Sequence, residues 1–211
     1  MSAETHHYLS DEDVVYFIRV FTLLYADDTI VLAETAEQLQ LALNAVYEYC
    51  QTWKLTVNID KTKIVIFCKR KVTEFPAFLF GHRILENVDD YTYLGVIFNY
   101  NGSFDKAIAK QILQGKRAFY ALLARVKKLR IPIDIALELF NQMVLPILLY
   151  GSEIWGFQNI TQIEVLYRKF LKCLLHINSN TPNVMVYGET GTHPIEIHVV
   201  TRMITLKLII I

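Results

Sequence analysis

The amino-acid sequence predicts an α+β fold for the first half of the chain and an α-helical bundle for the second half. Short β-rich runs and one amphipathic helix occupy residues 21–101, whereas long helical patterns fill residues 103–176. The change of pattern after Asn101-Gly102 places a domain boundary near residue 101. The predicted domains are therefore residues 21–101 and 102–211, with residues 1–20 left as an unassigned leader.

Two adjacent carboxylates stand between two apolar runs in residues 21–33, in the sequence Tyr25-Ala-Asp-Asp28. Strand-forming residues on both sides of Asp in a turn predict an antiparallel β-hairpin. Hard divalent cations prefer carboxylate oxygens, so two acidic side chains without a basic neighbour suit a metal ion. The alternative is an Asp pair that only caps the turn.

A helix is predicted over residues 36–53, because Thr35 and Gln38 have the spacing of a capping box. The apolar residues of this segment recur at helical spacing on one face, which is expected to be buried. These residues are Leu39, Leu43, Val46, Cys50 and Trp53.

Several short strands are predicted after this helix. Leu55–Asn58 is a short extended piece and Lys63–Cys68 is rich in β-branched residues. The run Phe78–Leu85 is typical of a second hairpin with Gly81 in its turn, and Tyr93–Phe98 reads as a further strand. Antiparallel pairs of such strands against a helix indicate an α+β layer.

The second half of the chain is predicted to be helical over residues 103–130, 134–150 and 160–176. Pro132 and the glycines at 151 and 156 separate these segments. Residues 178–182 are expected to form a turn, and the remainder to Ile211 to be mostly helical. Trp155 and Tyr150 are expected to anchor the core rather than to stack on bases.

The composition is that of a globular protein, because 53% of the 211 residues are hydrophobic and Gly and Pro are sparse. The three cysteines, Cys50, Cys68 and Cys173, are far apart and suit a reducing compartment. Residues 1–10 lack the pattern of a secretory signal, and no apolar run is long enough to span a bilayer. We therefore expect no membrane partner.

The formal net charge of zero conceals a strong asymmetry along the chain. Residues 1–50 carry nine acidic side chains and one basic, whereas residues 51–130 carry fifteen basic and six acidic. Between residues 106 and 130 there are eight basic residues and no acidic one. Such a row attracts a phosphate backbone; the alternative is a solvated helix face. The eight are Lys106, Lys110, Lys116, Arg117, Arg125, Lys127, Lys128 and Arg130.

Three segments, in this order, resemble the non-LTR (LINE-type) retrotransposon reverse transcriptases. Tyr25–Asp28 matches the catalytic motif C of the palm, and Leu55–Phe67, with Asn58, Lys61 and Thr62, is similar to motif D. Tyr93-Leu94-Gly95 is similar to the segment that forms the primer grip. The helical half resembles the thumb and the region beyond it, in Val144–Gly156, Tyr167–Lys172, Thr181–Asn183 and Tyr187–Glu189.

The resemblance implies a role for each of these residues in RNA-directed DNA polymerisation with Mg²⁺. Asp27 would be the main bridging metal ligand and Asp28 a secondary one. Lys61 would lie near the leaving phosphate as a proton donor; the alternative is a surface lysine at a strand entry. Tyr93, Leu94 and Gly95 would hold the primer backbone, or else form an ordinary core strand.

The resemblance also implies the partners, which are an RNA template and an RNA–DNA hybrid held by the basic thumb helix. Residues 1–20 contain no Gln and no Gly, and nothing frames Asp11 and Asp13 as a metal-binding strand. The fingers and palm motifs A and B are thus not recognised, and the isolated chain is expected to be inactive. The alternatives are a non-catalytic nucleic-acid-binding remnant and a non-functional relic, and a partner chain is a further hypothesis for completing the palm.

Overall fold

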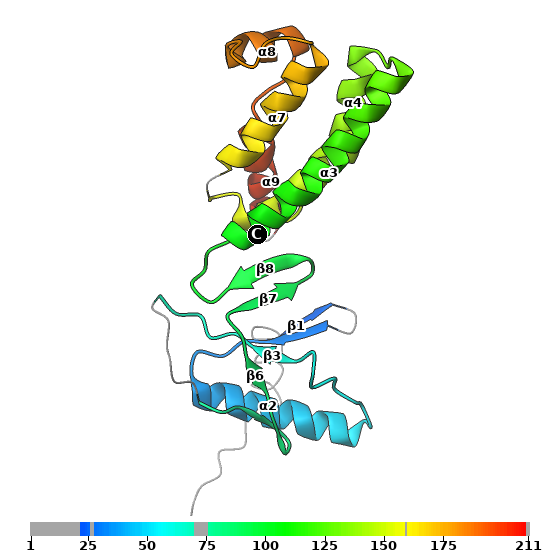
Figure 1. Cartoon of the computed structure of the whole chain (residues 1–211). Coiled ribbons are helices and arrows are strands. Elements are labelled where there is room, and N and C mark those ends of the chain that lie inside the picture. The colour runs from blue at the N-terminus through cyan, green and yellow to red at the C-terminus, as the bar shows by residue number, and fades with distance from the viewer. Residues whose placement is uncertain (1–21, 26–27, 70–75, 159, 210–211) are drawn as a thin grey trace, which may run out of the picture. The chain divides into compact units, whose positions relative to one another are not determined.

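The computed structural model describes residues 22–25, 28–69, 76–158 and 160–209, which form helices and short strands (Figure 1). The unassigned leader, residues 1–20, lies outside these residues. The chain divides into two compact units, Met1–Asp89 and Asp90–Ile211, called here unit 1 and unit 2. The division lies between Asp89 and Asp90, whereas the sequence placed it near residue 101.

The strands of unit 1 are short and pair two by two. Their bounds are β1 (Thr22–Tyr25), β2 (Asp28–Val31), β3 (Lys63–Ile64), β4 (Leu79–Phe80), β5 (Arg83–Ile84) and β6 (Glu86–Asn87). The pairs β1–β2 and β4–β5 are antiparallel, whereas β3–β6 is parallel. The described residues therefore form separate two-stranded sheets rather than one antiparallel sheet. Only the first two residues of the predicted strand 63–68 find a partner, because β6 is itself two residues long.

Helix α2 (Ala36–Thr52) begins at the predicted cap. The Gln38 N–H donates to Thr35 Oγ1 at 3.2 Å, and Gln38 Oε1 accepts from the Glu34 N–H at 3.2 Å. These bonds satisfy backbone N–H groups at the helix start. The predicted buried face is confirmed at Leu43 and Cys50, but the prediction is wrong for Trp53, whose side chain lies past the end of the helix and is 65% exposed.

The core of unit 1 lies between α2 and β4. The Tyr47 and Phe80 rings meet edge to face with centroids 5.3 Å apart. The side-chain amide of Gln40 on α2 pairs with the backbone of β4. Its Nε2 donates to Leu79 O and its Oε1 accepts from the Leu79 N–H, both at 2.9 Å. Gly81 turns the predicted β4–β5 hairpin with φ of +61°, and a Cβ there would lie 2.5 Å from Tyr47 Cε2.

Unit 2 begins with the antiparallel hairpin β7 (Asp90–Tyr93) and β8 (Val96–Asn99). The sequence assigned these strands to the first domain. Val96 is instead buried in the same core as the helices, with Ile97 and Phe98 packed against it. The Phe98 and Phe104 rings meet with centroids 5.6 Å apart. Apolar packing thus joins this hairpin to the helical part of the chain.

The remainder of unit 2 is helical, and the described residues between 103 and 176 contain no strand, as predicted. Figure 1 shows α3, α4 and α7 running alongside one another. Phe119, Phe140 and Phe170 are fully buried where these three helices meet, with the Phe140 and Phe170 rings stacked at 4.2 Å. The helices are α3 (Asp105–Leu129), α4 (Ile133–Met143), α5 (Leu145–Leu148), α6 (Ser152–Trp155), α7 (Thr161–Leu174), α8 (Asn183–Thr190) and α9 (Ile195–Ile209).

Candidate nucleic-acid interface

The Asp-Asp segment lies where β1 passes into β2. These strands pair in the predicted antiparallel sense, with Tyr25 opposite Asp28. The Tyr25 side chain is 62% exposed, and Asp28 is also exposed. Asp27 lies outside the described residues. The structure thus places Asp28 in solvent at the start of β2, and the arrangement of the tip stays a prediction.

The described residues do not by themselves assemble a metal centre. No group of three or more His, Cys, Asp or Glu side chains converges within the described part of the chain. Two-metal catalysis needs carboxylates from more than one strand. Binding of Mg²⁺ by Asp27 and Asp28 therefore remains a prediction.

Lys61 lies in a tight turn that is organised by Asn58. The Lys61 N–H donates to Asn58 Oδ1 at 3.2 Å, and Thr62 Oγ1 donates to Asn58 O at 2.9 Å. The Asn and Thr of this motif thus have a local structural role, which is to close the turn that precedes β3. The Lys61 side chain itself is exposed.

The Tyr93-Leu94-Gly95 segment forms a hairpin turn rather than the middle of a strand. Tyr93 ends β7, while Leu94 and Gly95 have φ of +45° and +82°. Positive φ at both central positions is typical of the turn that matches strand twist in a two-residue hairpin. Leu94 is strained in this conformation, because its Cβ crowds the backbone.

Two side chains from the helical part hold this turn. Tyr150 Oη donates to Leu94 O at 2.6 Å, and Lys110 Nζ donates to Gly95 O at 3.0 Å. A Cβ on Gly95 would lie 3.1 Å from the Tyr150 ring. Sequence reasoning missed the role of Tyr150, which is 48% exposed rather than a core anchor, whereas Trp155 is fully buried as predicted.

The first two cations of the basic row have structural partners. Lys106 forms an ion pair with Asp90 of β7, and Lys110 binds the Gly95 carbonyl. Both residues were predicted to bind nucleic acid as free charges. The prediction of eight charges without a counter-charge is wrong for Lys106, because the fold brings an acid from sixteen residues earlier against it.

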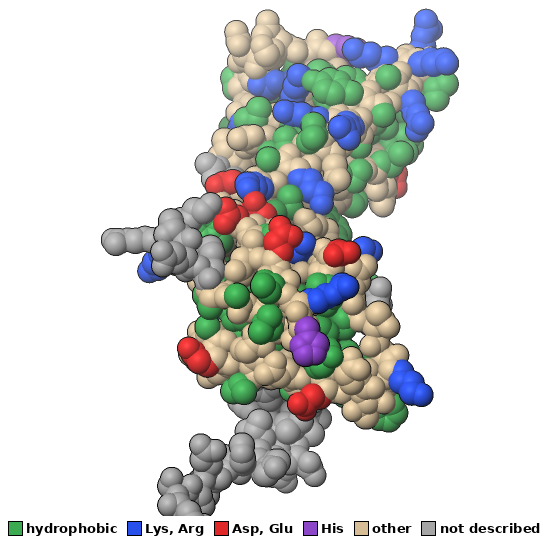
Figure 2. Space-filling model, turned by 60° about the horizontal axis from the view of Figure 1, so that its bottom comes forward, with side chains coloured by type: hydrophobic (Ala, Val, Ile, Leu, Met, Phe, Trp, Pro, Cys, Tyr) green, Lys and Arg blue, Asp and Glu red, His purple; other side chains and the backbone are tan. Residues whose placement is uncertain are grey.

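The other six cations of the row are exposed and lie outside the buried stripe of α3. That stripe includes Ile108, Ile112, Phe119, Leu122 and Val126. On the face seen in Figure 2, Lys and Arg side chains gather over the helical part. The candidate interface therefore lies towards the C-terminal part of α3. Its exposed cations are Lys116, Arg117, Arg125, Lys127, Lys128 and Arg130.

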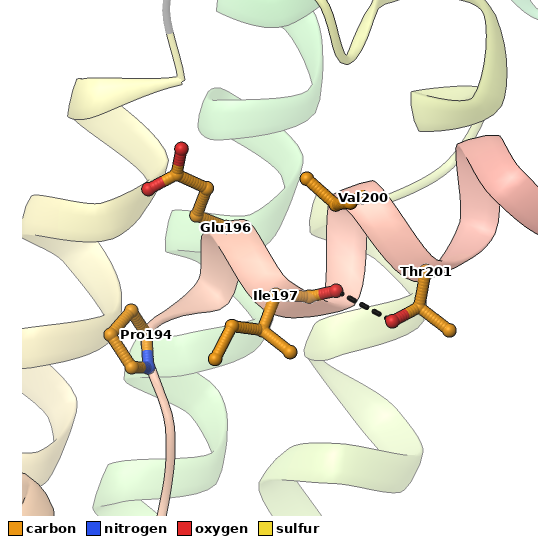
Figure 3. A pocket seen from close by; sticks show the side chains of 5 residues that line it. All are labelled: Pro194, Glu196, Ile197, Val200 and Thr201. Atoms are coloured by element: carbon orange, nitrogen blue, oxygen red, sulfur yellow. Dashed lines mark hydrogen bonds between the residues drawn. The ribbon is translucent and has the colours of Figure 1, made fainter.

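A shallow hollow on α9 offers no comparable chemistry. Figure 3 shows its lining, in which Thr201 Oγ1 donates to Ile197 O at 2.8 Å and Glu196 is the single ionisable side chain. The other lining residues are Pro194 and Val200. This hollow supports neither an acid–base pair nor a phosphate site.

The most perturbed titratable groups of unit 2 are structural. Glu164 on α7 accepts hydrogen bonds from Tyr187 Oη and, at 2.7 Å, from the Ile195 N–H. Burial and the bond to Glu164 raise the pKa of Tyr187 well above its usual range, and burial also raises the pKa of Tyr167. These groups tie α8 and the start of α9 to α7.

Comparison with known proteins identifies the class of the first part of the chain. Residues 3–98 match the family model described as reverse transcriptase (RNA-dependent DNA polymerase). This region is therefore a partial reverse transcriptase domain. Its last residues form the β7–β8 hairpin, so the match crosses from unit 1 into unit 2.

The related proteins come from mobile elements of the LINE type. The chain is 25% identical to the RNA-directed DNA polymerase from mobile element jockey of Drosophila melanogaster, over 72% of this chain and 18% of that protein. It is 26% identical to the probable RNA-directed DNA polymerase from transposon BS of the same species, over 82% of this chain and 20% of that protein.

A putative uncharacterized transposon-derived protein of Caenorhabditis elegans is 29% identical over 64% of this chain and 48% of that protein. The chain thus spans less than half the length of these relatives. No solved structure gives a significant match. Within the described residues, no helix is long and apolar enough to cross a membrane.

Proposed function

We propose that this chain contributes the C-terminal part of the palm and the thumb to a retrotransposon reverse transcriptase, whose reaction is RNA-directed DNA polymerisation. The reverse transcriptase match to residues 3–98 supports the palm assignment. The relatives align over up to 82% of the chain, which extends the similarity into the helical part.

Asp27 and Asp28 are the proposed ligands for Mg²⁺, with Asp27 as the bridging ligand. In polymerases of this kind two divalent ions activate the 3′-hydroxyl and stabilise the leaving pyrophosphate. The exposure of Asp28 at the start of β2 leaves its carboxylate open to such an ion.

The observation that carries the nucleic-acid role is the acid-free row of exposed cations on α3. Between Lys116 and Arg130 the helix and its cap carry six cations and no carboxylate. A solvated helix usually mixes the two signs of charge. We propose that this row holds the phosphate backbone of an RNA–DNA hybrid without reading its sequence.

The test is fluorescence anisotropy with a labelled RNA–DNA hybrid across a salt series. Replacing Lys127, Lys128 and Arg130 together by Gln should make the slope of log affinity against log salt shallower by up to about 2.7, because each duplex phosphate that is no longer neutralised changes the slope by about 0.9. An unchanged slope would assign the row to a solvated helix face.

A second candidate is a nucleic-acid-binding chain without catalysis of its own. This second candidate is favoured because the candidate metal ligands, Asp27 and Asp28, both belong to one hairpin. Two-metal chemistry needs carboxylates from separate strands. We expect the isolated chain not to extend a primer on an RNA template with Mg²⁺ or Mn²⁺. Incorporation that disappears in Asp27→Ala would instead assign catalysis to this chain.

A further inference from the structure

Helix α7 presents a cation at its contact with α3. Lys169 Nζ donates to Tyr120 Oη at 2.9 Å, and the same ammonium lies 5.4 Å from the centre of the Tyr120 ring. Directly beneath, the Phe119 and Phe170 rings meet edge to face at 5.7 Å. Lys169 is exposed, and its ammonium is held by Tyr120 at the boundary between the two helices.

The face of α3 next to α7 carries two further cations. Lys116, Tyr120 and Lys127 lie within about 40° of one another around the helix, because successive residues rotate by about 100°. Since Tyr120 contacts Lys169, this is the side of α3 that borders α7. Lys116 and Lys127 are both exposed and lie about 16 Å apart along the axis at 1.5 Å per residue.

No carboxylate neutralises these three lysines within the described part of the chain. The ion pairs among the described residues include Lys63–Glu86, Lys106–Asp90 and Arg202–Glu153. Glu164, the acidic residue of α7, is engaged by Tyr187 and by the Ile195 N–H. The three lysines at the α3–α7 boundary thus form no ion pair among the described residues, and Lys169 is held there by Tyr120.

We propose that Lys116, Lys127 and Lys169 form one phosphate-binding surface across α3 and α7, here called the seam surface. This inference rests on the proposed function and adds a second helix to the interface. Packed helices lie 8–10 Å apart, so the seam surface presents two cations on α3 and one on α7. Cations side by side on two helices suit a duplex, which offers phosphates from both strands, better than a single strand.

The partner is therefore an RNA–DNA or RNA duplex bound through its backbone, independently of sequence. Arg168 and Lys207 serve as a control of equal charge, because they belong to the same unit and lie outside the cation row of α3. Arg168 lies about 100° from Lys169 around α7, and Lys207 is an exposed residue of α9.

The experiment compares two double variants of the full chain by anisotropy with the same RNA–DNA hybrid. Lys116→Gln with Lys169→Gln should make the salt slope shallower by about 1.8, which corresponds to two duplex phosphates left without a cation. Arg168→Gln with Lys207→Gln removes the same charge and should leave the slope within about 0.5 of the unmodified chain. Equal effects of the two variants would overturn the seam surface in favour of diffuse attraction.

Further outcomes separate this inference from the proposed function. If the Lys127, Lys128 and Arg130 variant has a shallower slope while the Lys116 and Lys169 variant does not, α3 binds nucleic acid and the seam surface is wrong. If the unmodified chain does not bind the hybrid at low salt, both proposals fall. Tighter binding of single-stranded RNA than of the hybrid would overturn the duplex assignment. Thermal unfolding shows whether each variant is folded. If a double variant does not fold, the single variant Lys169→Gln is compared with Arg168→Gln instead.

Discussion

The two units of this chain differ in how much they bury. Among the described residues, the core cluster of unit 1 has six buried members, whereas that of unit 2 has twenty-three. The strands of unit 1 that follow α2 are only two residues long, but unit 2 contains a helix of 25 residues. The Tyr25–Asp28 segment, which is proposed to be the catalytic motif, therefore belongs to the unit with the smaller core.

The β7–β8 hairpin sharpens this contrast. It belongs to the matched reverse transcriptase region, yet its buried residues pack on the helices. The turn at Leu94-Gly95 is thus held by Tyr150 and Lys110 of unit 2. We expect this segment to follow the helical unit when unit 1 is perturbed.

The largest expected effect comes from opening the core of unit 2. Phe170→Ala removes a fully buried ring that stacks on Phe140 and should lower the free energy of unfolding of unit 2 by about 3–5 kcal/mol. The two tryptophans allow each unit to be followed separately, because Trp53 is exposed in unit 1 and Trp155 is buried in unit 2. Urea unfolding in a Trp53→Phe background reports on Trp155 alone.

A core substitution in unit 1 should have a smaller effect that does not reach Trp155. Leu43→Ala should cost about 2–3 kcal/mol, at the low end for such a change, because the surrounding cluster is small. The fluorescence of Trp53 should change at lower urea while the Trp155 transition keeps its midpoint. A joint shift of both signals would mean that the two units unfold as one.

Removing the hydroxyl that holds the hairpin turn should cost less. Tyr150→Phe deletes the bond to Leu94 O and should destabilise unit 2 by about 1 kcal/mol. Leu94 should then relax from its strained conformation, which amide hydrogen exchange at residues 94–97 would detect as faster exchange. Tyr93→Phe is the matched control, and equal acceleration in both variants would argue against the role of Tyr150.

The smallest expected effect concerns the first turns of α3. Lys106 and Lys110 hold β7 and the Gly95 carbonyl, so replacing both by Gln should leave the salt slope of hybrid binding almost unchanged. Stability should fall by less than about 1 kcal/mol from the loss of the largely exposed ion pair. A slope change as large as that of the Lys127, Lys128 and Arg130 variant would show that the whole row binds phosphate.

Local sequence signals predicted the elements that depend on local contacts. The Thr35 cap, the Gly81 hairpin and the helices separated at Pro132 all follow from residues within a few positions of each other. The Leu94 turn could not be predicted in this way, because a leucine disfavours positive φ and only the distant Tyr150 and Lys110 hold it there.

The candidate site was predictable to a similar extent. The cation row on α3 was visible in the sequence, but the pairing of Lys106 with Asp90 depends on the fold. The position of Lys169 could not be predicted, because it depends on Tyr120, which is 49 residues away in the chain. Asp27 lies outside the described residues, so its role in the candidate site stays a prediction.

The central claim is that the helical unit carries the nucleic-acid surface, and lysine footprinting tests it most directly. The full chain is acetylated briefly with and without an RNA–DNA hybrid, and each lysine is quantified by mass spectrometry. The hybrid should protect Lys116, Lys127, Lys128 and Lys169, while the exposed Lys54 of unit 1 should react equally in both samples. Protection confined to lysines of unit 1, or equal reactivity of the four helical lysines with and without the hybrid, would contradict the account.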